Sequence, residues 1–174
     1  MNSTISNKKR ATRHQDDIRI RKAKHRGAEA IESPHYESFL EYERAYTPEA
    51  FYITTPEKRE IESRIKHWTV WVALHRNVIV GKVSAHPKGE ALHIRSMAVR
   101  SSMQGRSIGK LLLQRVEKFA SDNRYKRLIL NTTPFLASAI RPYERFGFQA
   151  TGRERDWFGT TVSTMAKEVI QTRS

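Results

Sequence analysis

A short basic segment, residues 104–110, combines the residue types that bind phosphate groups. Gly105 and Gly109 allow backbone conformations that other residues resist, and a strongly amphipathic helix is predicted to begin within the segment. The first amides of a helix have no partner inside it, and the helix dipole adds positive potential there. Three cationic side chains surround the same point: Arg100, Arg106 and Lys110. The segment therefore predicts an anion site suited to a pyrophosphate.

Two better-known phosphate loops are excluded by their spacing. A dinucleotide-binding loop needs G-x-G-x-x-G, whereas this segment offers only Gly105 and Gly109. A nucleoside-triphosphate loop needs G-x-x-x-x-G-K-[ST]. Here one intervening residue is missing, and Leu111 stands where the hydroxyl belongs. A glycine-containing turn that binds no ligand is the alternative that the segment alone leaves open.

The segment resembles the signature of the GNAT superfamily of N-acetyltransferases, [RQ]-x-x-G-x-[GA], which lies between a strand and a helix. The match departs at the first glycine, which is Ser107 here, a small residue able to cap a helix or to donate its hydroxyl to a phosphate. The resemblance implies that acetyl-CoA (coenzyme A) is the cofactor and that a strand before the loop holds its pantetheine arm. The implied cofactor-binding residues are Met97, Ala98, Val99, Gln104, Gly105, Arg106, Ser107, Ile108, Gly109 and Lys110.

A second segment, residues 139–148, resembles the A-x-x-x-Y-E-[RK]-x-G-F segment of the same family. The resemblance places Tyr143 where these enzymes often keep a tyrosine that protonates the departing coenzyme A thiolate. Two positions depart from the pattern. Leu136 stands where the family commonly has an asparagine, and Pro142 is expected to shift or kink the helix before Tyr143. A tyrosine that only packs its helix is the alternative role.

Acetyl transfer to an amine also needs a base, because an alkyl amine has an unperturbed pKa of about 10.4 and must lose a proton. A histidine, with a pKa of about 6.5, is suited to accept it. The resemblance aligns His93 with a position where some members carry a catalytic Glu or His. Strand alternation places His93, Arg95, Met97 and Val99 on one face, directed into the cleft. Arg95 is then placed to lower the pKa of the histidine or to bind a carboxylate of the acceptor. A surface histidine is the alternative.

The resemblance further implies that the early helices and the last hairpin line the acceptor pocket. No residue there is chemically specific enough to name the acceptor, and roles in the core or in a lid are the alternatives. The aromatic residues concerned are Tyr46, Phe51, Tyr52, Trp157 and Phe158.

The elements that must position these residues follow from hydrophobic periodicity. Alternation of period two predicts strands, and three of them are joined by short turns into a meander. The predicted strands are residues 18–23, 68–74, 78–85, 91–99, 126–131, 148–153 and 161–169. The predicted helices are two short ones within 27–45, broken at Pro34, followed by 57–67, 108–124 and 137–146, the last ending at Gly147. This order predicts an α/β fold, with a GNAT-like, mixed, mostly antiparallel central sheet and helices on both faces. A basic flexible tail (residues 1–17) precedes a single domain (residues 18–174).

The charge and the composition of the chain limit which kinds of partner are expected. The net charge is +14, and residues 1–26 hold nine Lys and Arg against two acids, which favours an anionic partner such as a phosphorylated cofactor, an acidic substrate or nucleic acid. There are no cysteines, and the seven histidines lack the paired spacing of metal ligands, so no metal is expected. The sequence lacks a long apolar run, so no membrane segment and a cytoplasmic location are expected. Either a monomer or a homodimer fits the sequence.

Three functional hypotheses remain. The first is an N-acetyltransferase acting on a small-molecule primary amine. The second is a GNAT-like enzyme acting on an RNA-bound or protein substrate. The third is a non-catalytic protein that binds nucleic acid or coenzyme A. Salt-dependent binding to nucleic acid would favour a nucleic-acid partner, and acetyl-CoA turnover separates the enzymes from the binding proteins.

Overall fold

The computed structural model describes residues 18–171, and the tail predicted for residues 1–17 lies outside them. Seven strands form one sheet in the order β1-β2-β3-β4-β5-β7-β6. Only β4 and β5 pair in parallel, and every other neighbouring pair is antiparallel. The strands are β1 (Ile18–Lys22), β2 (Thr69–His75), β3 (Val78–Lys88), β4 (Ala91–Val99), β5 (Arg127–Thr132), β6 (Gln149–Trp157) and β7 (Thr160–Glu168).

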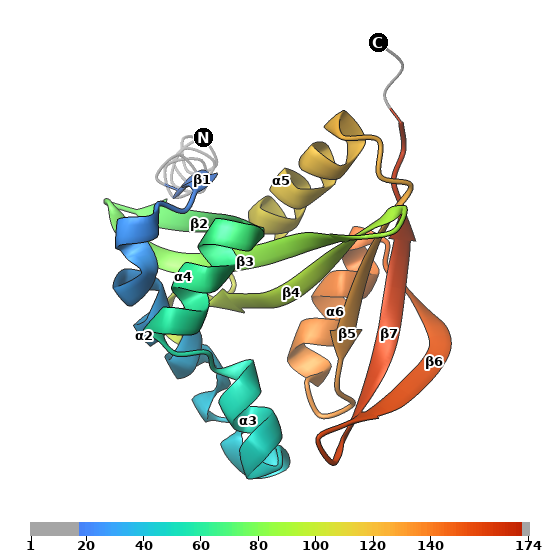
Figure 1. Ribbon diagram of the computed structural model, residues 1–174, viewed down its shortest axis with the longest axis horizontal. Coiled ribbons are helices and arrows are strands. Elements are labelled where there is room, and N and C mark those ends of the chain that lie inside the picture. Colours follow the sequence, from blue (N-terminus) through green and yellow to red (C-terminus); the bar gives the residue numbers. More distant parts are fainter. Residues whose placement is uncertain (1–17, 172–174) are drawn as a thin grey trace, which may run out of the picture.

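Helices cover both faces of this sheet, which confirms the predicted fold class (Figure 1). The α-helices are α2 (Ala28–Leu40), α3 (Pro48–Thr54), α4 (Lys58–His67), α5 (Ile108–Asp122) and α6 (Ala137–Phe146). The short 3-10 helices are η1 (His25–Gly27), η2 (Glu43–Ala45) and η3 (Ser101–Met103). No helix among residues 18–171 combines the length and the apolar character needed to cross a membrane.

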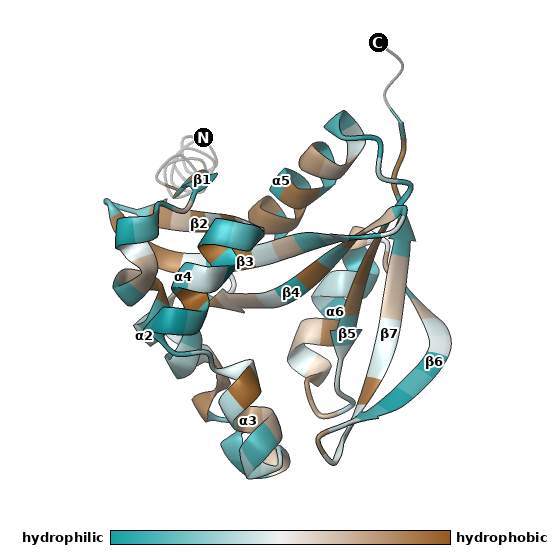
Figure 2. Cartoon of the chain, viewed as in Figure 1, coloured by the Kyte–Doolittle hydropathy of each residue, from teal (hydrophilic) through white to brown (hydrophobic). Residues whose placement is uncertain are grey.

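Two hydrophobic cores lie on opposite faces of the sheet. The larger core packs α5 and α6 against β2–β5, and its centre includes Trp71, Leu92 and Leu112. The smaller core packs α2 and α4 against β2 and β3 around Ile31 and Val72. Figure 2 shows hydrophobic residues along the central strands and a hydrophilic edge strand, β6, whose residues are almost all exposed.

Helix α2 runs through Pro34, so the predicted break into two short helices is wrong. A proline inside a helix removes one backbone hydrogen bond and costs about 3 kcal/mol. Pro34 is buried, and α2 packs against α4, β3 and β4. Burial of this helix face therefore outweighs the local penalty. Pro142 is likewise contained within the continuous helix α6.

A β-bulge in β4 changes the direction of its side chains. Two residues of β4, Ser96 and Met97, lie opposite one residue of β3, and Ser96 has a φ of 51°. Met97 and Val99 consequently pack against the larger core, on the side of α5. The predicted alternation, which placed them on the same face as His93 and Arg95, is therefore wrong, because an extra residue inverts the faces that follow it.

Strands β4 and β5 separate beyond a short paired segment. Their parallel pairing ends at Ile94 and Leu130, although β4 continues to Val99 and β5 continues to Thr132. Within the described part of the chain, no strand pairs with the edge of β4 that faces β5 from Arg95 onward. Backbone amides and carbonyls at this edge are therefore available to an extended ligand.

Candidate active site

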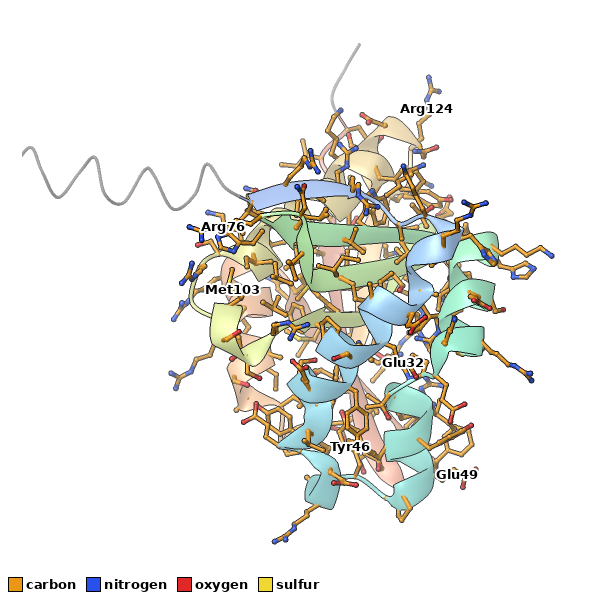
Figure 3. All side chains as sticks on the ribbon, turned by 90° about the vertical axis from the view of Figure 1, so that its left-hand side faces the viewer. Glu32, Tyr46, Glu49, Arg76, Met103 and Arg124 are labelled. Atoms are coloured by element: carbon orange, nitrogen blue, oxygen red, sulfur yellow. The ribbon has the colours of Figure 1, made fainter. Side chains whose placement is uncertain are left out.

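A cavity of about 660 Å³ occupies the space where β4 and β5 separate. Its walls come from α2, β4, the loop before α5, β5, α6 and β6, so residues distant in the sequence meet there. Figure 3 shows Tyr46, one lining residue, between α2 and α3. The predicted site residues that line the cavity are His93, Arg95, Met97, Ala98, Val99, Gln104, Gly105, Ser107, Ile108, Gly109, Lys110, Tyr143 and Trp157. Arg106, Phe51 and Tyr52 are absent from its lining.

The loop before α5 presents unpaired backbone amides to this cavity. The first helical hydrogen bond runs from the amide of Leu111 to the carbonyl of Ser107, at 3.0 Å. The three preceding amides thus have no acceptor inside the helix. A side chain at Gly109 would find only the Met97 methyl group, 3.8 Å away, so the approach to these amides is open. Arg100 does not contribute to this cradle, because its guanidinium pairs with Glu37 at 3.1 Å.

Ser107 adopts a left-handed backbone conformation, with φ of 61°. Its side chain makes no capping hydrogen bond, so the expected helix-capping role is not observed. A left-handed conformation costs a residue with a Cβ about 1 kcal/mol, whereas glycine adopts it freely. This geometry explains why the signature that the loop resembles carries glycine at this position.

Ser107→Gly is therefore expected to raise the free energy of unfolding by about 0.5 kcal/mol, because relief of strain exceeds the added entropy of the unfolded chain. Urea unfolding measures this change. Ser101→Gly is the matched control: Ser101 lies in η3 without a positive φ, so this substitution should lower the stability. If the Ser107→Gly variant is less stable than the unsubstituted protein, the inference of backbone strain at Ser107 is wrong.

Tyr143 projects from α6 and lines the cavity. Its side chain is 9% exposed and meets the Phe148 ring edge-on, with the ring centroids 5.9 Å apart. Burial, followed by the neighbouring Tyr46, raises the pKa of Tyr143 to about 12. The phenol therefore stays protonated throughout the neutral range and is available as a proton donor.

His93 lies on β4 with only 4% of its surface exposed. Its Nε2 is 3.3 Å from the Asn131 Nδ2, and the Thr164 hydroxyl donates to the Asn131 Oδ1 at 3.0 Å. The amide group of Asn131 therefore donates to an unprotonated Nε2. Burial, followed by the charge of Arg95, lowers the pKa of His93 to about 3, so the ring is neutral at pH 7.

The acceptor residues expected from the sequence occupy different environments. Tyr46 and Trp157 line the cavity. Phe51 is buried and forms an aromatic cluster with Tyr46. Tyr52 is 63% exposed on α3 and does not belong to this cluster.

Several lining residues were not anticipated by the sequence analysis. Arg64, Thr132 and Arg155 reach the cavity from α4, β5 and β6. The Thr132 hydroxyl is buried and has no hydrogen-bond partner in the described part of the chain, so it can bond a ligand. Lys82 does not line the cavity, but it gave one sequence signal of a polar region beside Arg64: it interrupts the apolar strand Val78–Lys88, and a lysine in a buried strand is unusual.

No cluster of three or more His, Cys, Asp or Glu side chains suited to a metal occurs within residues 18–171. The site consists instead of an open strand edge, a cradle of amides, a buried phenol and a neutral imidazole. This combination and the mixed sheet define an α/β fold of the N-acetyltransferase type. The chain belongs to the acetyltransferase (GNAT) family, whose sequence model matches residues 36–148.

Curated relatives share parts of the chain. N-acetylaspartate synthetase of Danio rerio is 34% identical over 107 residues, which are 59% of this chain and 38% of that protein. N-acetyltransferase family 8 member 2 of Rattus norvegicus is 36% identical over 92 residues, which are 49% of this chain and 41% of that protein. The chain therefore spans about two fifths of the length of these relatives.

A solved structure shows the same fold. The PaiA N-acetyltransferase of Thermoplasma acidophilum, in complex with coenzyme A, superimposes with a TM-score of 0.75 at 18% identity. The match covers 87% of this chain and 98% of that one.

Proposed function

We propose that the protein transfers the acetyl group of acetyl-CoA to a primary amine by direct attack of the amine on the thioester. The observation that carries the proposal is the opening between β4 and β5, where a free strand edge meets the amide cradle of α5 in one cavity. The cradle suits a pyrophosphate, and the strand edge suits the amide-containing pantetheine arm. Acetyl-CoA, when bound, supplies an activated acyl group.

The residues of the cavity fit this cofactor. Gly109 leaves room at the cradle, and Thr132, another lining residue, has a buried hydroxyl without a hydrogen-bond partner in the described part of the chain. Gln104–Lys110 would hold the phosphates, and the backbone of Met97–Val99 would hold the pantetheine arm. Backbone amides near Val99 are candidates to polarise the thioester carbonyl.

His93 is the candidate acceptor of the proton that the unprotonated amine releases as its nitrogen attacks the thioester carbonyl. A histidine with a pKa of about 3 is a weak base, so it needs a substrate amine that is itself easily deprotonated. Arg64, Arg95 and Arg155 supply that condition, because they line the same cavity and positive charges lower the pKa of a nearby ammonium group.

Tyr143 is the candidate acid for the sulfur that leaves when the C–S bond breaks. Its phenol has a pKa of about 12, whereas a free thiol has a pKa of about 8.5. Burial disfavours both anions in the same way, so the pKa of a thiolate beside Tyr143 is also raised. The phenol donates its proton to the sulfur as the C–S bond breaks, and the phenolate left behind takes a proton from solvent after coenzyme A is released.

Acetyl-CoA binding and turnover test this function. Calorimetry measures binding, and a thiol reagent detects the free coenzyme A released in the presence of amines. The protein contains no cysteines and therefore does not consume the reagent. Absence of acetyl-CoA binding would contradict the proposal.

The pH dependence of the reaction tests the role of His93. Because its pKa is about 3, the ring is already unprotonated above pH 4, and no inflection near pH 6.5 is expected. The logarithm of kcat/KM should rise with a slope of one until the pKa of the acceptor amine. Loss of thioester absorbance follows the rate without a pH-sensitive reagent.

His93→Gln is expected to lower kcat by at least about tenfold and to leave the shape of this profile unchanged. An inflection near pH 6.5 that disappears in His93→Gln would contradict the lowered pKa. An unchanged kcat in His93→Gln would show that His93 does not act as the base.

A further inference from the structure

Four cationic side chains lie along β4 between His93 and the bulge at Ser96, and we call Arg64, Lys82, Arg95 and Arg155 the cationic wall. They come from α4, β3, β4 and β6, and all but Lys82 line the cavity. Lys82 lies behind this surface, 2% exposed, and donates to the Ser96 hydroxyl at 2.8 Å. Arg64 donates to the same hydroxyl at 2.9 Å, so Ser96, in the bulge of β4, links these two members of the wall.

The wall has too little negative charge to balance it. Glu60 accepts from the Arg64 Nε at 2.9 Å. Within residues 18–171, Lys82, Arg95 and Arg155 form no ion pair with a carboxylate. Burial, followed by repulsion from Arg64 and Arg155, lowers the pKa of Arg95 against a smaller opposing effect of Glu60. Burial, followed by Arg64, lowers the pKa of Lys82. Crowded cations of this kind are stabilised by a bound anion.

The anion is distinct from the cofactor phosphates. The Ser96 hydroxyl accepts a hydrogen bond from Arg64 of α4. The methyl group of Met97, the next residue, lies beside Gly109 of the phosphate cradle. The bulge therefore separates the two positive regions onto opposite faces of β4. Trp157, at the end of β6, lines the cavity together with Arg155.

On the basis of the proposed function, we propose that the acceptor is a small amine that carries carboxylate groups, of the size of a free amino acid, and that Arg95 and Arg155 bind its carboxylates. A planar guanidinium matches a carboxylate with two parallel hydrogen bonds. The cavity of about 660 Å³ must also receive the acyl end of acetyl-CoA, which leaves room for a small acceptor. Polyamines and lysine side chains are disfavoured, because the wall repels a cation that brings no compensating charge.

A series of amino acids and their amides tests the proposal at low ionic strength, with rates compared at equal concentrations of the unprotonated amine. L-Aspartate and L-glutamate are compared with L-asparagine, L-glutamine and L-asparaginamide, and coenzyme A release is measured with the thiol reagent. We expect kcat/KM to fall by about tenfold or more for each carboxylate replaced by an amide. The KM for the carboxylate acceptors should rise with added salt, because Arg155 is exposed.

Variants assign the effect to the wall. Arg95→Gln and Arg155→Gln should each raise the KM for the best carboxylate acceptor about tenfold and leave the Kd for acetyl-CoA unchanged. Arg95→Lys should raise this KM less than Arg95→Gln does, because lysine keeps the positive charge but cannot form the two parallel hydrogen bonds of a guanidinium. Arg153→Gln is the matched control, since Arg153 is exposed on the same strand and lies outside the cavity lining.

Two kinds of failure are distinguishable. Equal turnover of neutral amines, or a preference for a polyamine, a basic peptide or an amine attached to an RNA oligonucleotide, would overturn the carboxylate acceptor and leave the acetyltransferase function intact. Where no acceptor is turned over, L-aspartate and L-glutamate are titrated into the protein–coenzyme A complex, and absence of binding overturns the inference. Loss of acetyl-CoA binding itself would instead contradict the proposed function.

Discussion

Gly109→Glu is expected to weaken acetyl-CoA binding by at least about a hundredfold, because it places a carboxylate among the amides that would hold the pyrophosphate. Juxtaposed like charges cost several kcal/mol, and about 2.8 kcal/mol already corresponds to a hundredfold change in Kd. The substitution should not unfold the protein. A Cβ at Gly109 meets only the Met97 methyl group at 3.8 Å, and a carboxylate near a helix N-terminus stabilises the helix.

Calorimetry gives the Kd, and thermal unfolding shows whether the variant is folded. Gly109→Ala separates the effect of size from the effect of charge and should change the Kd only slightly. Gly27→Glu is the matched control at another helix start, where an added Cβ has no neighbour within 4 Å. Wild-type affinity in a folded Gly109→Glu variant would show that the phosphates do not bind at α5.

Tyr143→Phe is expected to lower kcat by about a hundredfold without changing the Kd for acetyl-CoA, because it removes only the hydroxyl that we propose as the proton donor to the leaving sulfur. The ring itself is retained, so its edge-on contact with Phe148 and its place in the larger core are preserved. The unsubstituted enzyme should show no loss of activity from Tyr143 ionisation below about pH 11, since a phenol with a pKa of about 12 remains protonated there.

The measurement is a comparison of kcat and of the Kd for acetyl-CoA between the two proteins. Tyr125→Phe is the control, because Tyr125 also packs against the larger core but does not line the cavity. Its kcat should equal that of the unsubstituted protein. A Tyr143→Phe variant with full kcat would show that the thiolate leaves unprotonated or takes its proton from solvent.

Local signals predicted much of this fold. Strand β4 and helix α6 have the predicted bounds, because period-two alternation and a helix that ends at Gly147 are both readable within a short window. Gly147 has a φ of 104°, which glycine adopts without strain. The loop from Gln104 to Lys110 was likewise readable from its glycines, its charges and the helix that follows.

Long-range packing overruled the local signals elsewhere. Judged from its neighbours in the sequence, Pro34 predicts a break in the helix. The burial of α2 against β3 and β4 nevertheless keeps the helix continuous. No glycine in the sequence indicates the bulge at Ser96. The bulge exists because β4 carries one extra residue where it pairs with β3. Alternation along a single strand cannot reveal a mismatch that involves its neighbour.

The sequence by itself determined the family resemblance, the order of the elements and the position of the glycine-bearing loop before α5, because each depends on residues close together in the chain. Only the tertiary structure decided which charges share the cavity. Arg64, Arg95 and Arg155 lie on three different elements, and their proximity results from sheet order, the bulge in β4 and the separation of β4 from β5. Electrostatic interactions depend on distance in space and on burial, which a linear pattern does not contain.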